Sequence, residues 1–380
     1  MMDQIPFNRP CLTGREMEYV AEAVQQGQLS SGGPFTAKAS TLLRTALDAE
    51  EVLLTTSCTD ALEMSAMLLE LGPDDVVIVP SFTFSSTAAA FARQGAKLRF
   101  CDIRRPDLGL DPDHVEDCID DRVRAIVTVH YAGVASDVTR LQSIADRHDI
   151  ALIEDNAHGL FAEHDGAPLG TFGRMSTLSF HDTKNFICGE GGALVLNDRD
   201  DISAARILLD KGTNRQQFIE GQVDKYTWQG HGSSFGLSDL LAAFLFAQLE
   251  SAESIRSSRR NVSETYRSLL SEHAEELGIE LPFEHPGDTP ADHMFYVLLP
   301  ASCDRGAVIQ AMRSRGVNPT FHYIPLHSSP GGKLLSDRFQ ECPVTDDISA
   351  RLLRLPFSND LDVRDQGRVV DALISAMKNE

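Results

Sequence analysis

The sequence lacks any apolar run of the roughly 18 residues that a membrane-spanning helix requires. Its start, residues 1–7, lacks the basic segment followed by an apolar one that marks an export signal. We therefore expect neither a membrane partner nor secretion, but a cytoplasmic protein. The chain also has no internal repeat, low-complexity segment or long tail that would indicate a fibrous or disordered class.

Basic residues are scarce: 34 Lys and Arg stand against 56 Asp and Glu, which gives a net charge of -22. The field of such a chain repels polyanions, so we expect no bulk affinity for nucleic acid or acidic lipid. A phosphorylated small molecule would need a local pocket. With 380 residues and 42% hydrophobic content, the chain is long enough for a large domain and a smaller one, each with its own core.

Cysteine is present but without a pattern. The seven residues are odd in number and never spaced C-x-x-C, which fits neither a disulfide framework nor a zinc site. We expect reduced thiols and no metal. They are Cys11, Cys58, Cys101, Cys118, Cys188, Cys303 and Cys342.

Between residues 50 and 200, short apolar runs alternate with amphipathic stretches. The runs are rich in β-branched residues, and the stretches between them have helical spacing. This alternation predicts an α/β fold with a largely parallel sheet and crossover helices. The predicted strands are 53–54, 76–79, 98–100, 125–129, 151–153, 177–180 and 193–196.

The pattern becomes helical over a long stretch, 238–275, and then predicts a small α+β domain. We expect a large domain at 1–245, with an N-terminal arm at 1–15, and a small C-terminal domain at 246–380. The elements predicted for the small domain are strands at 294–299 and 319–324 and helices at 305–315 and 362–378.

A buried strand at 151–153 ends in polar residues, where an open parallel sheet places its ligands. Asp155 stands at this end and His158 follows three positions later. A carboxylate here can keep a pyridine nitrogen protonated, and the imidazole can reach another substituent of the ring. The alternative is a helix start with Asp155 as its N-cap.

Lys184 lies in a short loop between two predicted strands, five positions after Ser179 and just before the glycines of 189–192. A lysine that is desolvated in a tight loop loses its proton and becomes a nucleophile towards an aldehyde. Ser179 can address a phosphate of the same ligand. The alternative is a solvated lysine in a hairpin.

Two further segments suit a flat, phosphorylated ligand. Ser57, Cys58 and Thr59 begin an apolar helix, whose free N–H groups form an anion site, although Ser57 or Thr59 can equally serve as a plain N-cap. Phe84 follows the strand at 76–79, where its ring can stack on the ligand or pack in the core.

The order of these elements resembles one known layout: fold-type I enzymes that use pyridoxal phosphate, and among them the DegT/StrS family of nucleotide-sugar aminotransferases. The likeness rests on the segments 57–59, 80–84, 154–158 and 179–185. It implies a large domain with a mostly parallel central sheet, a small C-terminal α+β domain, and pyridoxal phosphate as cofactor.

The resemblance also implies roles for single residues. Lys184 would hold the cofactor covalently and move the proton, Asp155 would pair with the ring nitrogen, and His158 would contact the ring 3-oxygen. Phe84 would stack on the ring, and the phosphate would be held by Cys58, Thr59 and Ser179, with Ser57 beside them.

The segments 129–134, 211–215, 221–228 and 321–327 are similar to members that aminate dTDP-4-dehydro-6-deoxyglucose. This similarity implies L-glutamate as donor, with dTDP-4-amino-4,6-dideoxygalactose and 2-oxoglutarate as products, in the synthesis of a surface polysaccharide. Three alternatives stay open: a 3-keto or UDP-linked sugar, a sugar dehydratase, and a regulatory protein that binds the cofactor without turnover. Lys184 argues against the dehydratase, which has histidine there.

The family pattern is broken at two places. Many relatives have Ala-Gln where this chain has Ala157-His158, and many have an asparagine, donated by the partner subunit to the phosphate, where this chain has Ser234. A hydroxyl can replace that asparagine. The resemblance implies a homodimer or a dimer of dimers, with residues 211–228 near the interface.

Several rings are candidates for the substrate site. The sugar or nucleotide pocket can be lined by His322, Tyr323 and His327, and also by His130 and Tyr131. A packing role explains each of these residues equally well. A second set, His158, His164 and Asp165, lacks the spacing of a metal site.

Overall fold

The computed structural model describes residues 4–378. A mixed α/β architecture is confirmed: seven strands form one central sheet, and two pairs of short strands stand apart from it. The strands of the central sheet are β1 (Glu51–Thr55), β2 (Val76–Pro80), β3 (Lys97–Cys101), β4 (Val123–Val129), β5 (Ala151–Asp155), β8 (Met175–Ser179) and β9 (Gly192–Leu196). The short pairs are β6 (Glu163–His164) with β7 (Ala167–Pro168), and β10 (Tyr296–Leu298) with β11 (Leu352–Arg354).

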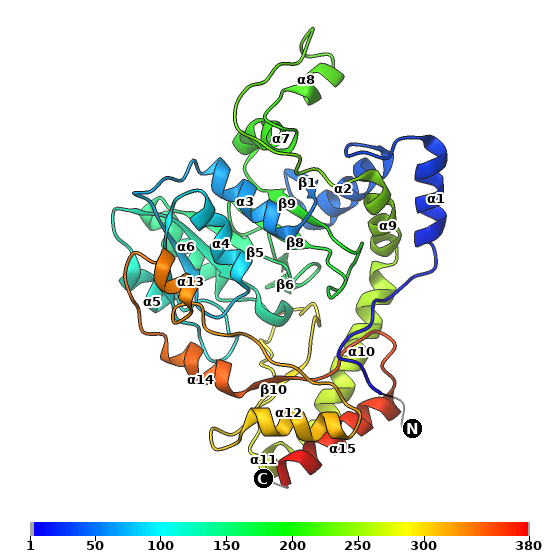
Figure 1. Ribbon diagram of the computed structural model, residues 1–380, viewed down its shortest axis with the longest axis vertical. Helices are drawn as coiled ribbons and strands as arrows, with labels where there is room; N and C mark the ends of the chain where they lie inside the picture. Colours follow the sequence, from blue (N-terminus) through cyan, green and yellow to red (C-terminus); the bar gives the residue numbers. More distant parts are fainter. Residues whose placement is uncertain (1–3, 379–380) are drawn as a thin grey trace.

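Helices cover both faces of this sheet (Figure 1). The described helices of the larger part are α1 (Glu16–Gln26), α2 (Pro34–Leu47), α3 (Cys58–Leu68), α4 (Ser85–Arg93), α5 (Pro112–Cys118), α6 (Val138–His148), α7 (Ile202–Leu209), α8 (Arg215–Ile219) and α9 (Asp239–Glu250). Those of the C-terminal part are α10 (Ala252–Ser271), α11 (Ala274–Leu277), α12 (Arg305–Ser314), α13 (Pro330–Leu335), α14 (Pro343–Arg351) and α15 (Val363–Lys378).

The strand order is β1-β9-β8-β5-β4-β2-β3, and β9 runs antiparallel to both of its neighbours while the other pairs are parallel. In β9, Leu194 and Leu196 pack into the core beneath α3, α4 and α7, whereas Ala193 and Val195 pack into the core beneath α1, α2 and α9. Because both faces of the strand are buried, its sequence is a continuous apolar run.

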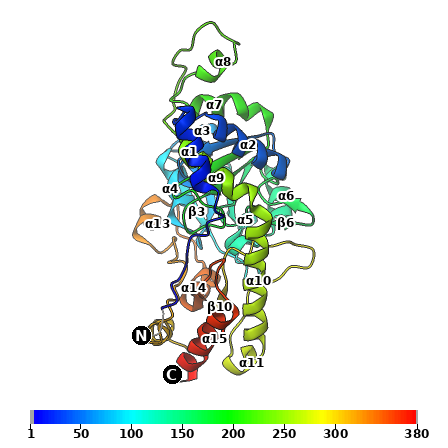
Figure 2. The same ribbon diagram turned by 90° about the vertical axis from the view of Figure 1, so that its right-hand side faces the viewer.

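The C-terminal part has a core of its own below the sheet. Side chains from α10, α12, α15 and the β10–β11 pair form one hydrophobic cluster there, and both chain ends lie near it (Figures 1 and 2). Ile5 of the N-terminal arm joins this cluster and pairs with Val317. The division into 1–245 and 246–380 stays a prediction, and the arm packs against the second of these parts.

Two predicted elements differ from the structure. The stretch 319–324 forms no strand, since β10 pairs with β11 instead and only Thr320 bridges to that pair. The predicted long helix at 238–275 is divided at Ser251, where the backbone leaves the helical region between α9 and α10. No helix among residues 4–378 is long and apolar enough to span a membrane, and the cytoplasmic location stays a prediction.

The buried carboxylate of Glu154, next to Asp155 on β5, ties the end of the sheet together. Its oxygens accept N–H groups from Gly170 at 2.8 Å, Phe172 at 2.8 Å and Gly173 at 2.7 Å. The ring of His130 contributes a fourth bond at 2.9 Å. The neighbouring Asp155 therefore stands on a rigid support.

Substitution of this carboxylate tests the support. In Glu154→Gln the amide NH₂ must face N–H donors, because His130 already accepts the Ser136 N–H at Nδ1 and so carries its proton on Nε2. We expect a loss of about 2–4 kcal/mol in the free energy of unfolding, measured with denaturant. The control Glu253→Gln, at a side chain that is 91% exposed, changes this free energy by less than about 0.5 kcal/mol. Equal stability of the two variants would contradict the assignment.

Candidate active site

A cavity of about 590 Å³ lies at the carboxyl ends of the parallel strands, where the sheet meets the C-terminal part. Its wall combines residues that are far apart in the sequence. Of the predicted site residues, the cavity contains Ser57, Cys58, Thr59, Phe84, Asp155, His158, Ser179, Lys184, His322 and Tyr323. Other lining residues are Phe7, Thr83, Ser86, Thr87, His181, Glu190, His293, Thr320 and Arg354.

Lys184 lies in the hairpin loop between β8 and β9. The loop is closed by backbone bonds from Phe180 N to Gly191 O and from Cys188 N to Phe180 O, and the N–H of Lys184 itself donates to His181 O at 2.9 Å. The sequence left two interpretations of Lys184, a desolvated lysine in a ligand site and a solvated lysine in a hairpin. The structure contains part of each, because the lysine is in a hairpin and also lines the cavity. These backbone bonds set the course of the loop that carries the lysine.

The pKa of Lys184 is lowered to about 8, mainly because burial disfavours the ammonium form, and the charge of Arg354 lowers it further. The nearby Cys58 and Asp155 act in the opposite direction. Burial raises the pKa of the Cys58 thiol to about 12, so this thiol stays protonated and does not compete as a nucleophile. Lys184 therefore remains the predicted nucleophile of the cavity.

The carboxylate of Asp155 is fixed by hydrogen bonds to both of its oxygens. Thr87 donates to its Oδ2 at 2.7 Å and the N–H of Ala157 to its Oδ1 at 3.2 Å, while Thr83 bonds Thr87 at 2.8 Å. Burial raises the pKa of Asp155, and these bonds and the charge of Lys184 oppose the rise. No helix begins after Asp155, so it is not an N-cap.

The ring of His158 is buried and stacks on His293, with centroids 4.3 Å apart and an angle of 17° between the planes. His293 is held by Asn185, whose Oδ1 lies 2.8 Å from Nδ1 of the ring. Nδ1 of His158 has no hydrogen-bond partner among the described residues, and burial keeps the pKa of this ring well below its usual range. A neutral imidazole thus offers one polar atom to a ligand.

Helix α3 points its N-terminus at the cavity. Ser57 is the N-cap of this helix, as one of the two interpretations of the sequence predicts, and accepts the Asp60 N–H at 3.0 Å. The hydroxyl of Thr59 donates to the Ser86 hydroxyl at 2.9 Å. Gly192 permits the loop to approach, because a Cβ there would lie 2.3 Å from Cys58 N. Capping leaves the serine proton free to donate, so these groups retain the properties of an anion site.

The C-terminal part supplies a cluster of rings. His322 stacks on Tyr323 with centroids 4.0 Å apart, and Nη1 of Arg354 donates to His322 Nε2 at 2.6 Å. Burial and the charges of Arg354 and Lys184 lower the pKa of His322 to about 2, so this ring stays neutral. Arg354 and His293 line the cavity but were not among the site residues predicted from the sequence. The signal for Arg354 was a lone charge within the apolar run 352–357.

Other candidates lie elsewhere. His327 is buried outside the cavity, where its Nδ1 bonds Ser81 at 2.7 Å. His130 pairs with Glu154, and Tyr131 packs behind His322. Phe84 lines the cavity with 61% of its surface exposed. Ser234 is exposed and is not among the residues that line this cavity.

Two groups of possible metal ligands occur among the described residues, both outside the cavity: Cys101, His114 and Cys118, and His164, His285 and Asp288. In the first group, His114 Nδ1 accepts the Asp102 N–H at 3.0 Å, so its Nε2 carries the proton and is not a free ligand. In the second group, His164 pairs with Asp288 at 2.8 Å. His158 is not a member of either group.

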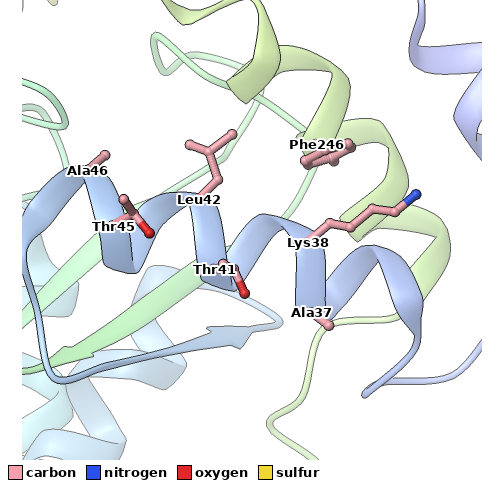
Figure 3. Close-up of a pocket in the computed structure, with 7 residues that line it drawn as sticks. All are labelled: Ala37, Lys38, Thr41, Leu42, Thr45, Ala46 and Phe246. Carbon is pink, nitrogen blue, oxygen red and sulfur yellow. The ribbon is translucent and has the colours of Figure 1, made fainter.

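A second hollow, of about 690 Å³, lies on the surface between α2 and α9. Figure 3 shows its wall, which comes from these two helices. Lys38 is the one titratable residue among the described residues of its wall, and the amine lies 4.3 Å from the centre of the Phe35 ring and 3.8 Å from Glu22. The described wall contains no acidic residue, and the cavity around Lys184 remains the candidate active site.

The model of the DegT/DnrJ/EryC1/StrS aminotransferase family matches residues 10–374. The chain belongs to this family. The aminotransferase TlmJ from Streptoalloteichus hindustanus is 28% identical to this chain, with a TM-score of 0.90 and 99% of each chain covered. DesV from S. venezuelae is also 28% identical, with a TM-score of 0.88 and the same coverage. Spr1654 from Streptococcus pneumoniae, solved in its PLP form, shares the fold at 22% identity and a TM-score of 0.90, with 99% of each chain covered.

The chain is therefore an aminotransferase that depends on pyridoxal phosphate, and the cavity fits this cofactor. A neutralisable amine, a buried carboxylate and an imidazole whose Nδ1 has no hydrogen-bond partner among the described residues line one space. The start of α3 suits the phosphate. These residue types are compatible with an aldehyde, a ring nitrogen, a ring oxygen and a phosphate.

The lowered pKa of Lys184 predicts how the cofactor attaches. Attachment requires the neutral amine, so its rate in the apoprotein should rise roughly tenfold from pH 7 to pH 9 and then level off, as a pKa of about 8 requires. Stopped-flow absorbance of the added cofactor measures this rate, with a free alkylamine as control for the ionisation of the cofactor. A rate that still rises steeply above pH 10 would contradict the lowered pKa.

Proposed function

We propose that this aminotransferase moves the amino group of L-glutamate onto the 4-keto carbon of dTDP-4-dehydro-6-deoxyglucose, giving dTDP-4-amino-4,6-dideoxygalactose and 2-oxoglutarate. The single observation that carries the proposal is that His322 and Tyr323, from the segment 321–327 that resembles such enzymes, face Lys184 across one cavity. TlmJ and DesV, its relatives at 28% identity, support aminotransfer in general and leave the sugar open.

Each protein group has a task at the reacting centre. Pyridoxal phosphate, when bound, supplies the aldehyde that exchanges amines and a ring that accepts electrons. Lys184 would hold the cofactor and would take and return the proton at the reacting carbon. Asp155 keeps a proton on the ring nitrogen, and Thr87 and the Ala157 N–H hold this carboxylate in place.

The remaining residues orient the cofactor. His158 Nδ1 would bond the ring 3-oxygen, and its stacking on His293 fixes the plane of the imidazole. Phe84 would cover one face of the cofactor ring, and Ser179 would join Cys58 and Thr59 at the phosphate. These assignments rest on the shared cavity and on the types of the residues.

An assay with a panel of keto-sugar nucleotides tests this function. We expect glutamate alone to release at most one equivalent of 2-oxoglutarate per bound cofactor, and continued release to require dTDP-4-dehydro-6-deoxyglucose. NMR should identify the amino sugar as the galactose epimer. A 3-keto sugar and a UDP-linked 4-keto sugar are the alternatives in the panel. In Lys184→Ala, both turnover and the visible absorbance of the bound cofactor should be lost.

Two outcomes would contradict the proposal. Absence of 2-oxoglutarate with every keto sugar would favour the regulatory alternative, and preference for a 3-keto or UDP-linked sugar would replace the substrate. Normal turnover by Lys184→Ala would remove the assignment of the nucleophile.

We also propose that the enzyme is a homodimer in which residues 211–228 contact the partner. This segment, which includes α8, projects from the body of the chain (Figure 1), and its Trp228 is 80% exposed. Apolar surface of this kind is common where a partner covers it. Ser234 stands next to this segment and would reach the phosphate of the partner's cofactor.

Light scattering of the purified enzyme tests the homodimer. The expected mass is twice the 41.7 kDa of one chain. In Ser234→Ala the dimer should remain, while the dissociation constant of the cofactor rises by roughly fivefold, as loss of one hydrogen bond implies. A monomer with full cofactor affinity would contradict the arrangement.

A further inference from the structure

We propose that His164, His285 and Asp288 form a binding site for a divalent transition-metal ion such as Zn²⁺. The site lies outside the cavity around Lys184, and the inference does not depend on the proposed function. It begins from three donor atoms, one from each side chain, that lie within 4.8 Å of one another. The spacing in the sequence did not predict this group, because 124 positions separate His164 from Asp288.

Two of the three side chains come from one tight turn. His285 is its first residue and Asp288 its last, and the Asp288 N–H donates to His285 O at 3.2 Å. Between them stand Pro286 and then Gly287, whose φ is 101°. Proline followed by a glycine with positive φ is typical of a type II turn. The local sequence therefore places the imidazole and the carboxylate at the two neighbouring ends of this turn.

The third side chain comes from the hairpin of β6 and β7. His164 is the last residue of β6, and the turn that follows it consists of Asp165 with a φ of 48° and Gly166 with a φ of 80°. An Asp-Gly pair with positive φ at both residues is typical of the type I′ turn of a short hairpin. Backbone bonds of 2.8 and 2.9 Å between Glu163 and Thr289 join this hairpin to the loop of the other turn. Both turns are thus held by the backbone before any ion binds.

The distances between the donor atoms suit one metal ion. Nδ1 of His164 lies 2.8 Å and Nδ1 of His285 3.3 Å from Oδ1 of Asp288. Two ligands of a tetrahedral zinc ion, each about 2.0–2.1 Å from the metal, are about 3.3 Å apart, and two imidazoles with one carboxylate are a ligand set that zinc takes. Two imidazole N–H groups that donate to one carboxylate would give similar distances, so the distances alone do not identify a metal ligand.

The second oxygen of the same carboxylate distinguishes the two accounts. The side chain of Asp288 is 6% exposed, and its Oδ2 has no hydrogen-bond partner among the described residues. Burial of a carboxylate oxygen without a partner is costly. The two imidazoles do not remove this cost, because both of them face Oδ1. A divalent ion, together with a water bound to it, would satisfy both oxygens.

A hollow of about 130 Å³ adjoins the group and has room for such a water. Among the described residues of its wall there are three acids and neither lysine nor arginine. The acids are Glu163, Glu284 and Asp288. On the other side, Oδ2 of Asp165 lies 3.9 Å from Nε2 of His164. A histidine that binds a metal through one nitrogen donates from the other to a group of this kind.

The segment after the turn leads to the active site. Ala291 O accepts the side-chain amide of Asn185 at 2.7 Å, and Nδ1 of His293 lies 2.8 Å from Asn185 Oδ1. Asn185 is the chain neighbour of Lys184. An ion at the turn would therefore fix the β6–β7 hairpin to a segment that supports the lysine loop. This role is structural and adds no step to the reaction.

Calorimetric titration of the holoenzyme with Zn²⁺, after a chelator has removed bound metal, tests the site. We expect a dissociation constant in the micromolar range or tighter. In His164→Ala and in Asp288→Asn the affinity should fall by at least about 100-fold, because loss of a ligand costs no less than loss of a group that only supports one. The control His148→Ala, at an exposed residue of α6, should leave the affinity unchanged.

X-ray absorption at the zinc edge identifies the ligands. With one ion per chain we expect a shell of nitrogen and oxygen at about 2.0–2.1 Å and no sulfur at about 2.3 Å. The other group of possible ligands, with Cys101 and Cys118, would give the sulfur shell. That shell, with an affinity that falls in Cys118→Ser but not in His164→Ala, would overturn the proposal.

Thermal unfolding gives a readout of the structural role. Zn²⁺ should raise the Tm of the wild type and of His148→Ala, and should leave that of His164→Ala unchanged, because only a protein that binds the ion gains stability from it. Circular dichroism checks the fold of each variant. If the buried substitutions do not fold, His285→Gln serves alone, since this side chain is 45% exposed. Equal zinc affinity in the wild type and the ligand variants, or no binding by the wild type, overturns the proposal.

Discussion

The partial burial of one amine is the constraint on which the electrostatics of the cavity depend. The side chain of Lys184 lines the cavity, and desolvation lowers its pKa to about 8. No single segment creates the effect: the arm contributes Phe7, the ends of the strands contribute Asp155, and the C-terminal part contributes Tyr323 and Arg354. The packing of distant parts of the chain therefore sets the reactivity of the lysine.

The cavity also differs electrically from the protein around it. The chain carries a net charge of -22, yet three of the four imidazoles that line the cavity, those of His158, His293 and His322, are held neutral because burial lowers their pKa values. Arg354 keeps a positive charge among them. Local charge, and not the net charge of the chain, decides whether an anionic ligand is repelled from such a cavity.

Local signals predicted much of the fold. The apolar runs at 76–79, 125–129 and 193–196 became strands because each is buried on both faces, and the hairpin around Lys184 followed from the glycines after it. The prediction of a strand at 319–324 was wrong. The alternation of this stretch suits a strand, but β11 occupies the pairing edge of β10. Ser251 divides the long predicted helix without a glycine or proline to mark the break.

The sequence by itself determined the family, the α/β class and the order of the lysine, the aspartate and the helix start that suits a phosphate, because these depend on short motifs and periodicity. Only the tertiary structure decided that His327 lies outside the cavity and that Arg354 lies inside it without a carboxylate partner. The physical reason is that burial and charge pairing depend on neighbours hundreds of residues away in the chain. Phe7, His322 and Arg354 meet only after the arm and the C-terminal part have packed together.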